Sequence, residues 1–331
     1  MVPMYDVCGV GNAIVDILVE VSNEDFDVFH FEKGSMRLVD VATQRRLLAV
    51  LKDEGAHMAS GGSVANSVIA LSQLGGNAAL IGLLGDDRYG LHYKERFDDF
   101  GIDMGSPLIA GAHTGTSVVL ITPDAERTMR TCLGVTSTLS EEHVDEARIK
   151  QSRWLFIEGY LLANSEAAHK AIFKAISCAK ANGVKVALTC SEAFIVDVFG
   201  VAFREVLAQA DLLFANESEA QAIARGASAE ESFATLRAVV PSCVVTAGAG
   251  GAFVRHEGQE FHVPAFACEP KDLTGAGDMF AGAFLYGLTH NIAAQDAAKA
   301  ACFLSMKVIS QVGARLAHGT KNYWNECLGL E

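Results

Sequence analysis

The sequence predicts an α/β fold with a mostly parallel central sheet and helices on both faces. From residue 150 on, short apolar strands alternate with Ala-rich helices; strands are expected at 154–157, 184–189, 211–215 and 243–246, and a long helix at 165–181. Repeated strand-then-helix order is typical of parallel sheets that are covered on both sides. Polar and glycine-rich stretches follow several of these strands, and such folds bind ligands at the carboxyl ends of their strands.

The composition is that of a full-sized globular protein. The chain has 331 residues, of which 50% are hydrophobic and 20% charged, and its net charge of −14 argues against a nucleic-acid partner. No apolar run is long enough to span a membrane, and no basic stretch leads into an apolar one at the N-terminus, so we expect a cytoplasmic protein without a membrane partner. The eight cysteines form no C-x-x-C pair, which favours reduced core residues over a zinc site.

The first two predicted strands, 5–10 and 14–21, are separated by Gly11-Asn12. Gly9-Val10-Gly11 lacks the third glycine of the dinucleotide fingerprint, because position 14 is Ile, and a strand follows instead of a helix. We therefore reject an NAD-dependent dehydrogenase. Asp16 interrupts the second apolar run, where a lone carboxylate is unfavourable unless it is paired or faces a ligand. The alternative is a solvated strand face, which Glu20 on the same side supports.

The next region predicts short strands and one helix. Residues 23–34 are expected to form a loop, 35–39 a strand and 41–51 an amphipathic helix capped by Asp40. Strands at 116–122 and 127–132 flank a predicted hairpin turn at 123–126. Arg127 and Arg130 are separated by an odd number of positions, so a regular strand points them to opposite faces.

Two helices are predicted to begin at glycine-rich turns. Gly61-Gly62 opens one with Asn66 in its second turn, and Gly275-Ala276-Gly277 opens the other with Asp278 in its first turn. The first turn of a helix has unpaired N–H groups and a partial positive charge. The glycine-rich turn Gly275-Ala276-Gly277 is therefore suited to hold phosphate. Asp278 would then lie where a general base for a hydroxyl nucleophile is needed. The alternative for this stretch is a simple turn and helix cap.

Three further sites follow strands, and each has a structural alternative. Tyr160 either packs in the core or forms a stacking wall for a base or sugar. Asn216 and Glu219 alone would be interpreted as a helix cap with an acidic first turn, and the glycine-rich stretch 246–252 as a hairpin.

Taken together, the motifs resemble the PfkB (ribokinase-like) family of sugar and nucleoside kinases. Its signatures are matched, in order, by Gly61-Gly62-x-x-x-Asn66, Asn216-x-x-Glu219, Thr246-x-Gly248-x-x-Gly251 and Asp272-Leu273-Thr274-Gly275-Ala276-Gly277-Asp278, where Leu273 replaces the common Thr. The resemblance implies one three-layer ribokinase-like domain over residues 1–331, with a small β-sheet lid built from roughly 12–40 and 112–133. No Walker P-loop is present, which disfavours that class of ATPase.

The resemblance also implies roles for individual residues in an ATP- and Mg²⁺-dependent phosphotransferase. Asp278 would be the catalytic base, and the N–H groups of Gly275, Ala276 and Gly277 would stabilise charge on the transferred phosphoryl group. The expected acceptor-binding residues are Asn12, Asp16, Gly61, Gly62, Asn66 and Arg127, to which we add Tyr160. The expected nucleotide-binding residues are Asn216, Glu219, Thr246, Gly248, Gly251 and Thr274, with Glu219 contacting Mg²⁺ through water.

The acceptor is expected to be small. The opening of the second strand, the Glu126–Met129 segment and the last signature resemble most the adenosine-kinase-like branch, which implies the 5′-hydroxyl of adenosine. The alternatives are a free sugar (ribose, fructose or a keto-deoxy sugar acid) and a non-catalytic nucleoside- or sugar-binding regulator, against which Asp278 argues. A monovalent cation such as K⁺, and a monomer or homodimer, remain open.

Overall fold

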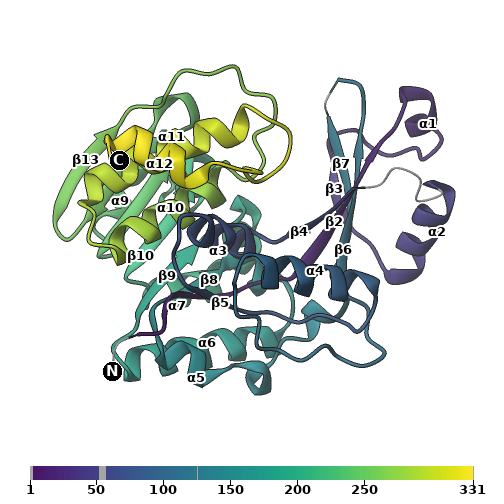
Figure 1. Cartoon of the computed structure of the whole chain (residues 1–331), viewed down its shortest axis with the longest axis horizontal. Coiled ribbons are helices and arrows are strands. Elements are labelled where there is room, and N and C mark those ends of the chain that lie inside the picture. The colour runs from purple at the N-terminus through teal and green to yellow at the C-terminus, as the bar shows by residue number, and fades with distance from the viewer. Residues whose placement is uncertain (1–2, 52–56, 125, 331) are drawn as a thin grey trace.

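The computed structural model describes residues 3–51, 57–124 and 126–330, and it contains one large and one small β-sheet (Figure 1). The large sheet has eight strands in the order β13-β12-β11-β10-β9-β8-β1-β5. They are β1 (Tyr5–Val10), β5 (Ala78–Ile81), β8 (Ser152–Glu158), β9 (Lys185–Thr189), β10 (Leu212–Asn216), β11 (Ser242–Thr246), β12 (Ala252–His256) and β13 (Gln259–Val263).

The large sheet is parallel from β5 to β11, which confirms the predicted fold class. The pairs β11–β12 and β12–β13 are antiparallel, so the sheet ends in two hairpin-connected strands. Because the parallel strands run in one direction, their carboxyl ends meet at one edge. Asn216 at the end of β10 lies opposite Thr246 at the end of β11.

Helices cover both faces of the large sheet. The first layer contains α3 (Ser63–Gln73), α10 (Ala276–Thr289), α11 (Ala294–Ile309) and α12 (Thr320–Leu328). The second contains α5 (Glu146–Lys150), α6 (Glu166–Ala181), α7 (Ala193–Leu207), α8 (Glu217–Ala224) and α9 (Ala229–Leu236). Successive side chains of a strand point to opposite faces of the sheet and so contribute to both hydrophobic cores. Val7 of β1 packs with the first layer, whereas Cys8 and Val10 pack with the second.

The small sheet stands beside the large body and has the strand order β3-β7-β6-β2-β4 (Figure 1). Its strands are β2 (Ile14–Glu20), β3 (Met36–Leu38), β4 (His57–Gly61), β6 (Gly115–Ile121) and β7 (Arg127–Cys132). The helices α1 (Asn23–Asp27), α2 (Val41–Leu51) and α4 (Arg88–Asp99) lie next to it in the chain. The strand β4 lies outside the two ranges from which we expected the lid to be built.

The prediction of a loop over residues 23–34 was wrong at its start. Ser22 caps the short helix α1, because its Oγ accepts a hydrogen bond of 3.0 Å from the N–H of Asp25. The cap expected at Asp40 is confirmed, since its Oδ1 accepts from the N–H of Thr43 at 2.6 Å. The predicted hairpin turn at 123–126 includes residue 125, which lies outside the described residues, but β6 and β7 do pair antiparallel.

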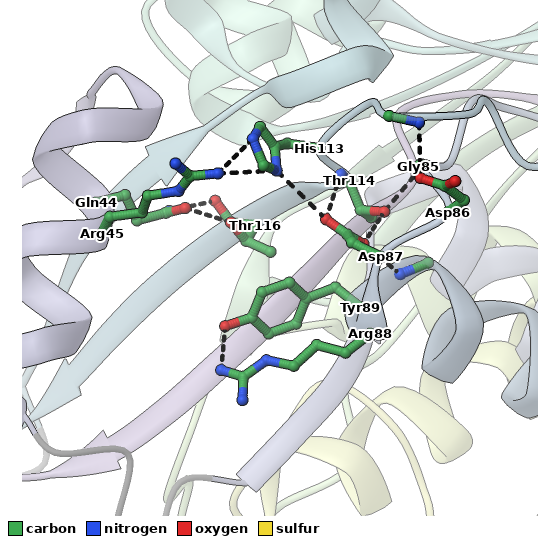
Figure 2. A network of polar contacts seen from close by, with 12 residues as sticks. Gln44, Arg45, Gly85, Asp86, Asp87, Arg88, Tyr89, His113, Thr114 and Thr116 are labelled. Carbon is green, nitrogen blue, oxygen red and sulfur yellow. Dashed lines mark hydrogen bonds and ion pairs between the residues drawn. The ribbon is translucent and has the colours of Figure 1, made fainter.

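A polar cluster joins the small sheet to the large body (Figure 2). Asp87 caps α4 through the N–H of Gly90 at 2.9 Å, and it also accepts from the N–H (3.0 Å) and Oγ1 (2.7 Å) of Thr114, next to β6. His113 lies 3.8 Å from Asp87 and contacts Arg45 of α2. These contacts therefore connect the N-terminus of α4, the residues just before β6 and the helix α2.

The helices α3 and α10 pack closely against each other. A Cβ atom on Gly282 would lie 2.1 Å from the carbonyl oxygen of Ser67, so only glycine permits this approach. The close approach brings the first turns of the two helices together.

No helix in the described parts of the chain is long and apolar enough to cross a membrane. All eight cysteines have free thiols, and most of them are buried.

Candidate active site

The carboxylate of Asp278 is held between α10 and α3. Its Oδ1 accepts a hydrogen bond of 2.6 Å from Ser63 Oγ, and its Oδ2 accepts one of 2.9 Å from Asn66 Nδ2. Burial raises the pKa of Asp278 to about 6, while these two hydrogen bonds and the charge of Arg315 oppose the shift. Asp278 is therefore mostly ionised at neutral pH, yet it is basic enough to accept a proton.

Asn66 has hydrogen-bonding capacity to spare. Its Oδ1 is buried and has no partner among the described residues, although buried polar atoms normally have one. The hydrogen-bonding capacity of this oxygen is therefore unused in the described part of the structure.

Asp16 extends from the small sheet to the same place. It lies in β2, opposite Ala59 of β4 and Ser117 of β6. A Cβ on Gly61 would lie 2.6 Å from Asp16 Oδ2, so the glycine leaves room for this carboxylate. Burial raises the pKa of Asp16 to about 6, against the charges of Arg315 and Arg127, and the charge of Asp278 adds to the rise. The two carboxylates are therefore close enough to influence each other.

Asn12 makes its hydrogen bonds within the protein. It is 1% exposed, donates to Glu158 Oε1 at 2.9 Å, and accepts from Asn164 Nδ2 at 2.9 Å and from Thr136 Oγ1 at 3.2 Å. Its carbonyl oxygen also packs against Gly62, where a Cβ would approach it to 2.1 Å. In this structure Asn12 fixes the turn after β1 and the start of α3.

Arg127 links the small sheet to the turn before α10. It forms an ion pair with Asp272 and donates to Thr274 Oγ1 at 3.2 Å. Asp272 also accepts from the N–H groups of Thr274 at 3.1 Å and Gly313 at 2.7 Å. Arg130 instead lies over the ring of Phe31 at 3.9 Å, which confirms that the two arginines point to opposite faces.

An apolar cavity of about 520 Å³ lies on the other side of the first turn of α10. Three of the predicted nucleotide-binding residues line it, namely Thr246, Gly248 and Gly251, and so do Ala276 and Gly277. Its apolar walls include Phe266, Phe280, Met306 and Ile309. Such walls suit an aromatic base, and the helix N-terminus at one end suits phosphate. A Cβ on Gly277 would meet no heavy atom within 4 Å, so the backbone there is open to a ligand. The residues present therefore fit an adenine nucleotide.

Asn216 and Glu219 form a reciprocal cap at the start of α8. Asn216 Oδ1 accepts from the N–H of Glu219 at 2.9 Å, and Glu219 Oε2 accepts from the N–H of Asn216 at 3.0 Å. Burial raises the pKa of Glu219 to about 7, and the charge of Asp278 contributes to the rise. The described residues contain no group of three or more His, Cys, Asp or Glu side chains that could hold a metal ion.

Tyr160 lies in the short 3₁₀ helix Gly159–Ala163 after β8, and its ring packs edge-on against Phe194 of α7 at 5.5 Å. Its role as a wall for a bound base or sugar stays a prediction.

Three residues of the site were not nominated from the sequence. Ser63 and Asp272 lie inside quoted motifs, and their neighbours could have indicated them: Ser63 directly follows the glycine pair, and Asp272 opens the last signature. Arg315 lies in a loop whose sequence matches no motif. The one hint of a role for it is that a charged residue stands between the apolar residues Ala314 and Leu316.

Similar proteins are kinases of sugars and nucleosides. Residues 36–320 match the family described as pfkB family carbohydrate kinase. A ribokinase from Haemophilus influenzae is 31% identical over 247 residues, which are 72% of this chain and 77% of the relative.

Solved structures agree with this match. A probable sugar kinase from Rhizobium etli has a TM-score of 0.89 at 29% identity, covering 99% of this chain and 100% of its own. An adenosine kinase from Sinorhizobium meliloti has a TM-score of 0.88 at 30% identity, covering 97% and 99%. A putative ribokinase II from E. coli, solved in complex with ATP and Mg²⁺, has a TM-score of 0.78 at 22% identity and covers 94% of each chain, so it shows the fold alone.

The match extends over most of the chain and includes the turn before α10 and the residues around Asp278. The small second sheet and the mostly parallel large sheet agree with it. This chain belongs to the pfkB family of carbohydrate kinases.

Proposed function

We propose that this kinase transfers the γ-phosphoryl group of ATP to a primary hydroxyl, the 5′-hydroxyl of adenosine. One observation carries the proposal: Asp278 lies where two different halves of a site meet. The preceding residue, Gly277, lines the apolar cavity, while the Asp278 carboxylate is held by α3 and is coupled electrostatically to Asp16 of the small sheet.

The chain's own groups divide the work. Thr246, Gly248, Gly251 and Thr274 would hold the nucleotide. Asn216 and Glu219 would hold Mg²⁺ through water, since Mg²⁺ usually keeps several waters and binds substrate phosphates. When bound, ATP and Mg²⁺ supply the phosphoryl group and a divalent charge.

The first turn of α10 acts on the transferred group. The N–H groups of Gly275, Ala276 and Gly277 donate to its oxygens, and Asp278 accepts the proton of the attacking hydroxyl. As the new O–P bond forms, the bond to the bridging oxygen breaks and its electron pair leaves with ADP. Positioning and electrostatics supply most of the acceleration in such transfers.

The small sheet acts as a lid in this proposal. Asp16, Gly61, Gly62 and Asn66 bind the hydroxyls of the acceptor, and the sheet excludes water when it covers them, which limits ATP hydrolysis. The ion pair between Arg127 and Asp272 supports this role, because it ties the small sheet to the turn before α10.

The choice of adenosine is supported by the likeness to the Sinorhizobium meliloti adenosine kinase over 97% of this chain. A free sugar is the second candidate, because the ribokinase from Haemophilus influenzae is 31% identical. A pentose presents the same kind of hydroxyls to Asp16 and Asn66 as the ribose of a nucleoside.

The test is ATP-dependent product formation with adenosine, other nucleosides, ribose, fructose and keto-deoxygluconate, with and without K⁺. We expect the highest kcat/KM with adenosine and its loss in Asp278→Asn. A preference for a free sugar would overturn the choice of acceptor, and a wild-type protein without turnover on any acceptor would overturn the kinase activity.

A further inference from the structure

Arg315 is a cation inside the acceptor side of the site. It lies in the segment between α11 and α12, next to Ala314, whose backbone packs against Gly275. Its Nη1 donates to Ser60 Oγ of β4 at 3.0 Å. The segment also binds the turn before α10, since the N–H of Gly313 donates to Asp272. Arg315 therefore reaches the small sheet from the same segment that supports the anion-binding turn.

The titratable groups around Arg315 come from three elements. They are Asp16 on β2, Asp278 on α10, and His92 and Tyr93 on α4, all of which interact electrostatically with it. Burial lowers the pKa of Arg315, and Tyr93, Asp16 and Asp278 counteract that shift. The guanidinium stays charged, because even a lowered arginine pKa is far above neutral pH.

The two arginines near the site differ in how they are paired. Arg127 has an ion pair with Asp272 and a hydrogen bond to Thr274. Arg315 has its side-chain hydrogen bond to Ser60 and, among the described residues, no carboxylate within ion-pair distance. A guanidinium carries five N–H donors, so most of those of Arg315 remain available. A partly buried charge with unused donors is unfavourable unless a ligand completes it.

We propose that Arg315 is a catalytic residue that binds the phosphoryl group as it passes to the acceptor hydroxyl. This inference rests on the proposed function. The acceptor hydroxyl must lie near Asp278, and an incoming phosphoryl group adds negative charge beside two carboxylates. Arg315 supplies the opposing charge at that point, and its planar fork matches two phosphoryl oxygens.

The test compares Arg315→Gln, Arg315→Lys and Arg315→Ala with the wild-type kinase on its best acceptor. We expect kcat to fall about 100- to 1,000-fold in Arg315→Gln, as for the loss of one preorganised donor to a developing charge. The KM for ATP should change little, because the nucleotide cavity lies on the other side of α10. Arg315→Lys should recover only part of kcat, since a point charge does not replace the fork.

Two readouts separate this role from a structural one. Guanidinium ions added at millimolar concentration should raise kcat of Arg315→Ala at least about tenfold, an effect that a damaged fold would not show. The acid limb of the kcat/KM profile should move to higher pH in Arg315→Gln, because Arg315 lowers the pKa of both Asp278 and Asp16. Ser60→Ala, which removes the bond that positions Arg315, should lower kcat by a smaller factor.

The matched control is Arg204→Gln, an exposed arginine on α7, which should behave as wild type. A rise in the KM of the acceptor at unchanged kcat would overturn the proposal, as would a lower melting temperature without rescue by guanidinium. An active wild type with unaffected Arg315 variants overturns this inference alone, whereas an inactive wild type overturns the proposed function.

Discussion

The two sides of the first turn of α10 are built from different materials. On the side that we propose binds the acceptor, Asp278, Asp16 and Arg315 lie in partly buried surroundings, and hydrogen bonds from neighbouring side chains hold Asp278, while Arg315 donates to Ser60. On the nucleotide side, the cavity is lined mainly by apolar side chains and glycine backbone. The acceptor side therefore depends on the chemical identity of single atoms, and the nucleotide side on shape.

This difference follows from what each side has to do. In the proposed function one side accepts a proton, so the carboxylate there needs a defined environment and a suitable pKa. The other side would hold a base and a chain of phosphates, which apolar walls and N–H groups can do without charged side chains. Isosteric changes should thus be severe on the acceptor side and mild on the nucleotide side.

The largest expected effect is that of Asp278→Asn. The change keeps the shape of the side chain and removes the base, so kcat should fall about 100- to 10,000-fold. The orphan Oδ1 of Asn66 can accept from the new amide if Asn66 rotates, so the fold should persist. Steady-state kinetics measure the loss, and titration with ATP should show nearly unchanged affinity. Loss of ATP binding together with turnover would mean that the two sides are not separable.

Glycine positions in the turn give the next effect. Gly275 has φ 79°, and a Cβ there would lie 2.1 Å from the carbonyl oxygen of Ala314, so Gly275→Ala should destabilise the protein by about 1–3 kcal/mol. Gly277→Ala is the matched control, because a Cβ there meets nothing within 4 Å. It should unfold at the wild-type temperature but bind ATP more weakly. Equal melting temperatures for the two variants would contradict the strain at Gly275.

The shape of the nucleotide cavity is tested by Ala249→Trp. Ala249 lines the cavity and is exposed, so a larger side chain fills the space without disturbing the core. The KM for ATP should rise by about 10- to 100-fold, the range that follows from losing roughly 1.4–3 kcal/mol of binding. The KM of the acceptor should not change. A change in the KM of the acceptor alone, with the KM for ATP unaffected, would mean that the nucleotide does not bind in this cavity.

The smallest effect is the pH dependence of the wild type. The folded pKa values of Asp278 and Asp16 are raised to about 6, so both carboxylates become protonated as the pH falls through this value. We expect kcat/KM to be constant well above the apparent pKa of this pair of carboxyl groups. At one pH unit below that apparent pKa, kcat/KM should be about tenfold lower. Glu219→Gln separates the contribution of Glu219, whose pKa is raised to about 7. A fall of kcat/KM with an apparent pKa near 4 would show that burial does not raise the pKa values of Asp278 and Asp16.

The same shifts set the sign of a stability effect. A carboxyl group with a raised folded pKa stabilises the protein below its unfolded value and loses that contribution as the pH rises to the folded value. For Asp278 this window runs from about 4 to about 6. Asp278→Asn should therefore melt at a higher temperature than the wild type at pH 7, and the difference should shrink at pH 4.

Much of the fold could be predicted from local patterns. The strands around 5–10, 154–157 and 243–246 were found because buried parallel strands are short apolar runs between glycines and polar residues. The helix α1 was missed although Ser22 and the acidic residues after it are a start signal, because its five residues bury only Phe26. The strand β4 was missed because its burial depends on pairing with β2, a contact that its own sequence does not encode.

The site was predictable where motifs are contiguous. Asp278, Asn66 and Gly277 could be nominated because a helix start fixes where neighbouring residues lie. Arg315 could not, since its place depends on a loop folding back across β4 and the turn before α10. Asn12 had a suggestive position, but only the structure shows that Glu158, Asn164 and Thr136 use its hydrogen bonds.

The missing side chain of Gly282 has a mechanical consequence. Because α3 and α10 touch there, the carboxylate of Asp278 and its two donors, Ser63 and Asn66, are held in one closely packed unit. Asp16 lies on β2, which pairs with β4, and β4 ends at Gly61, directly before α3. A shift of α3 would therefore be passed on both to the contacts of Asp278 and, through β4, to the strand that bears Asp16.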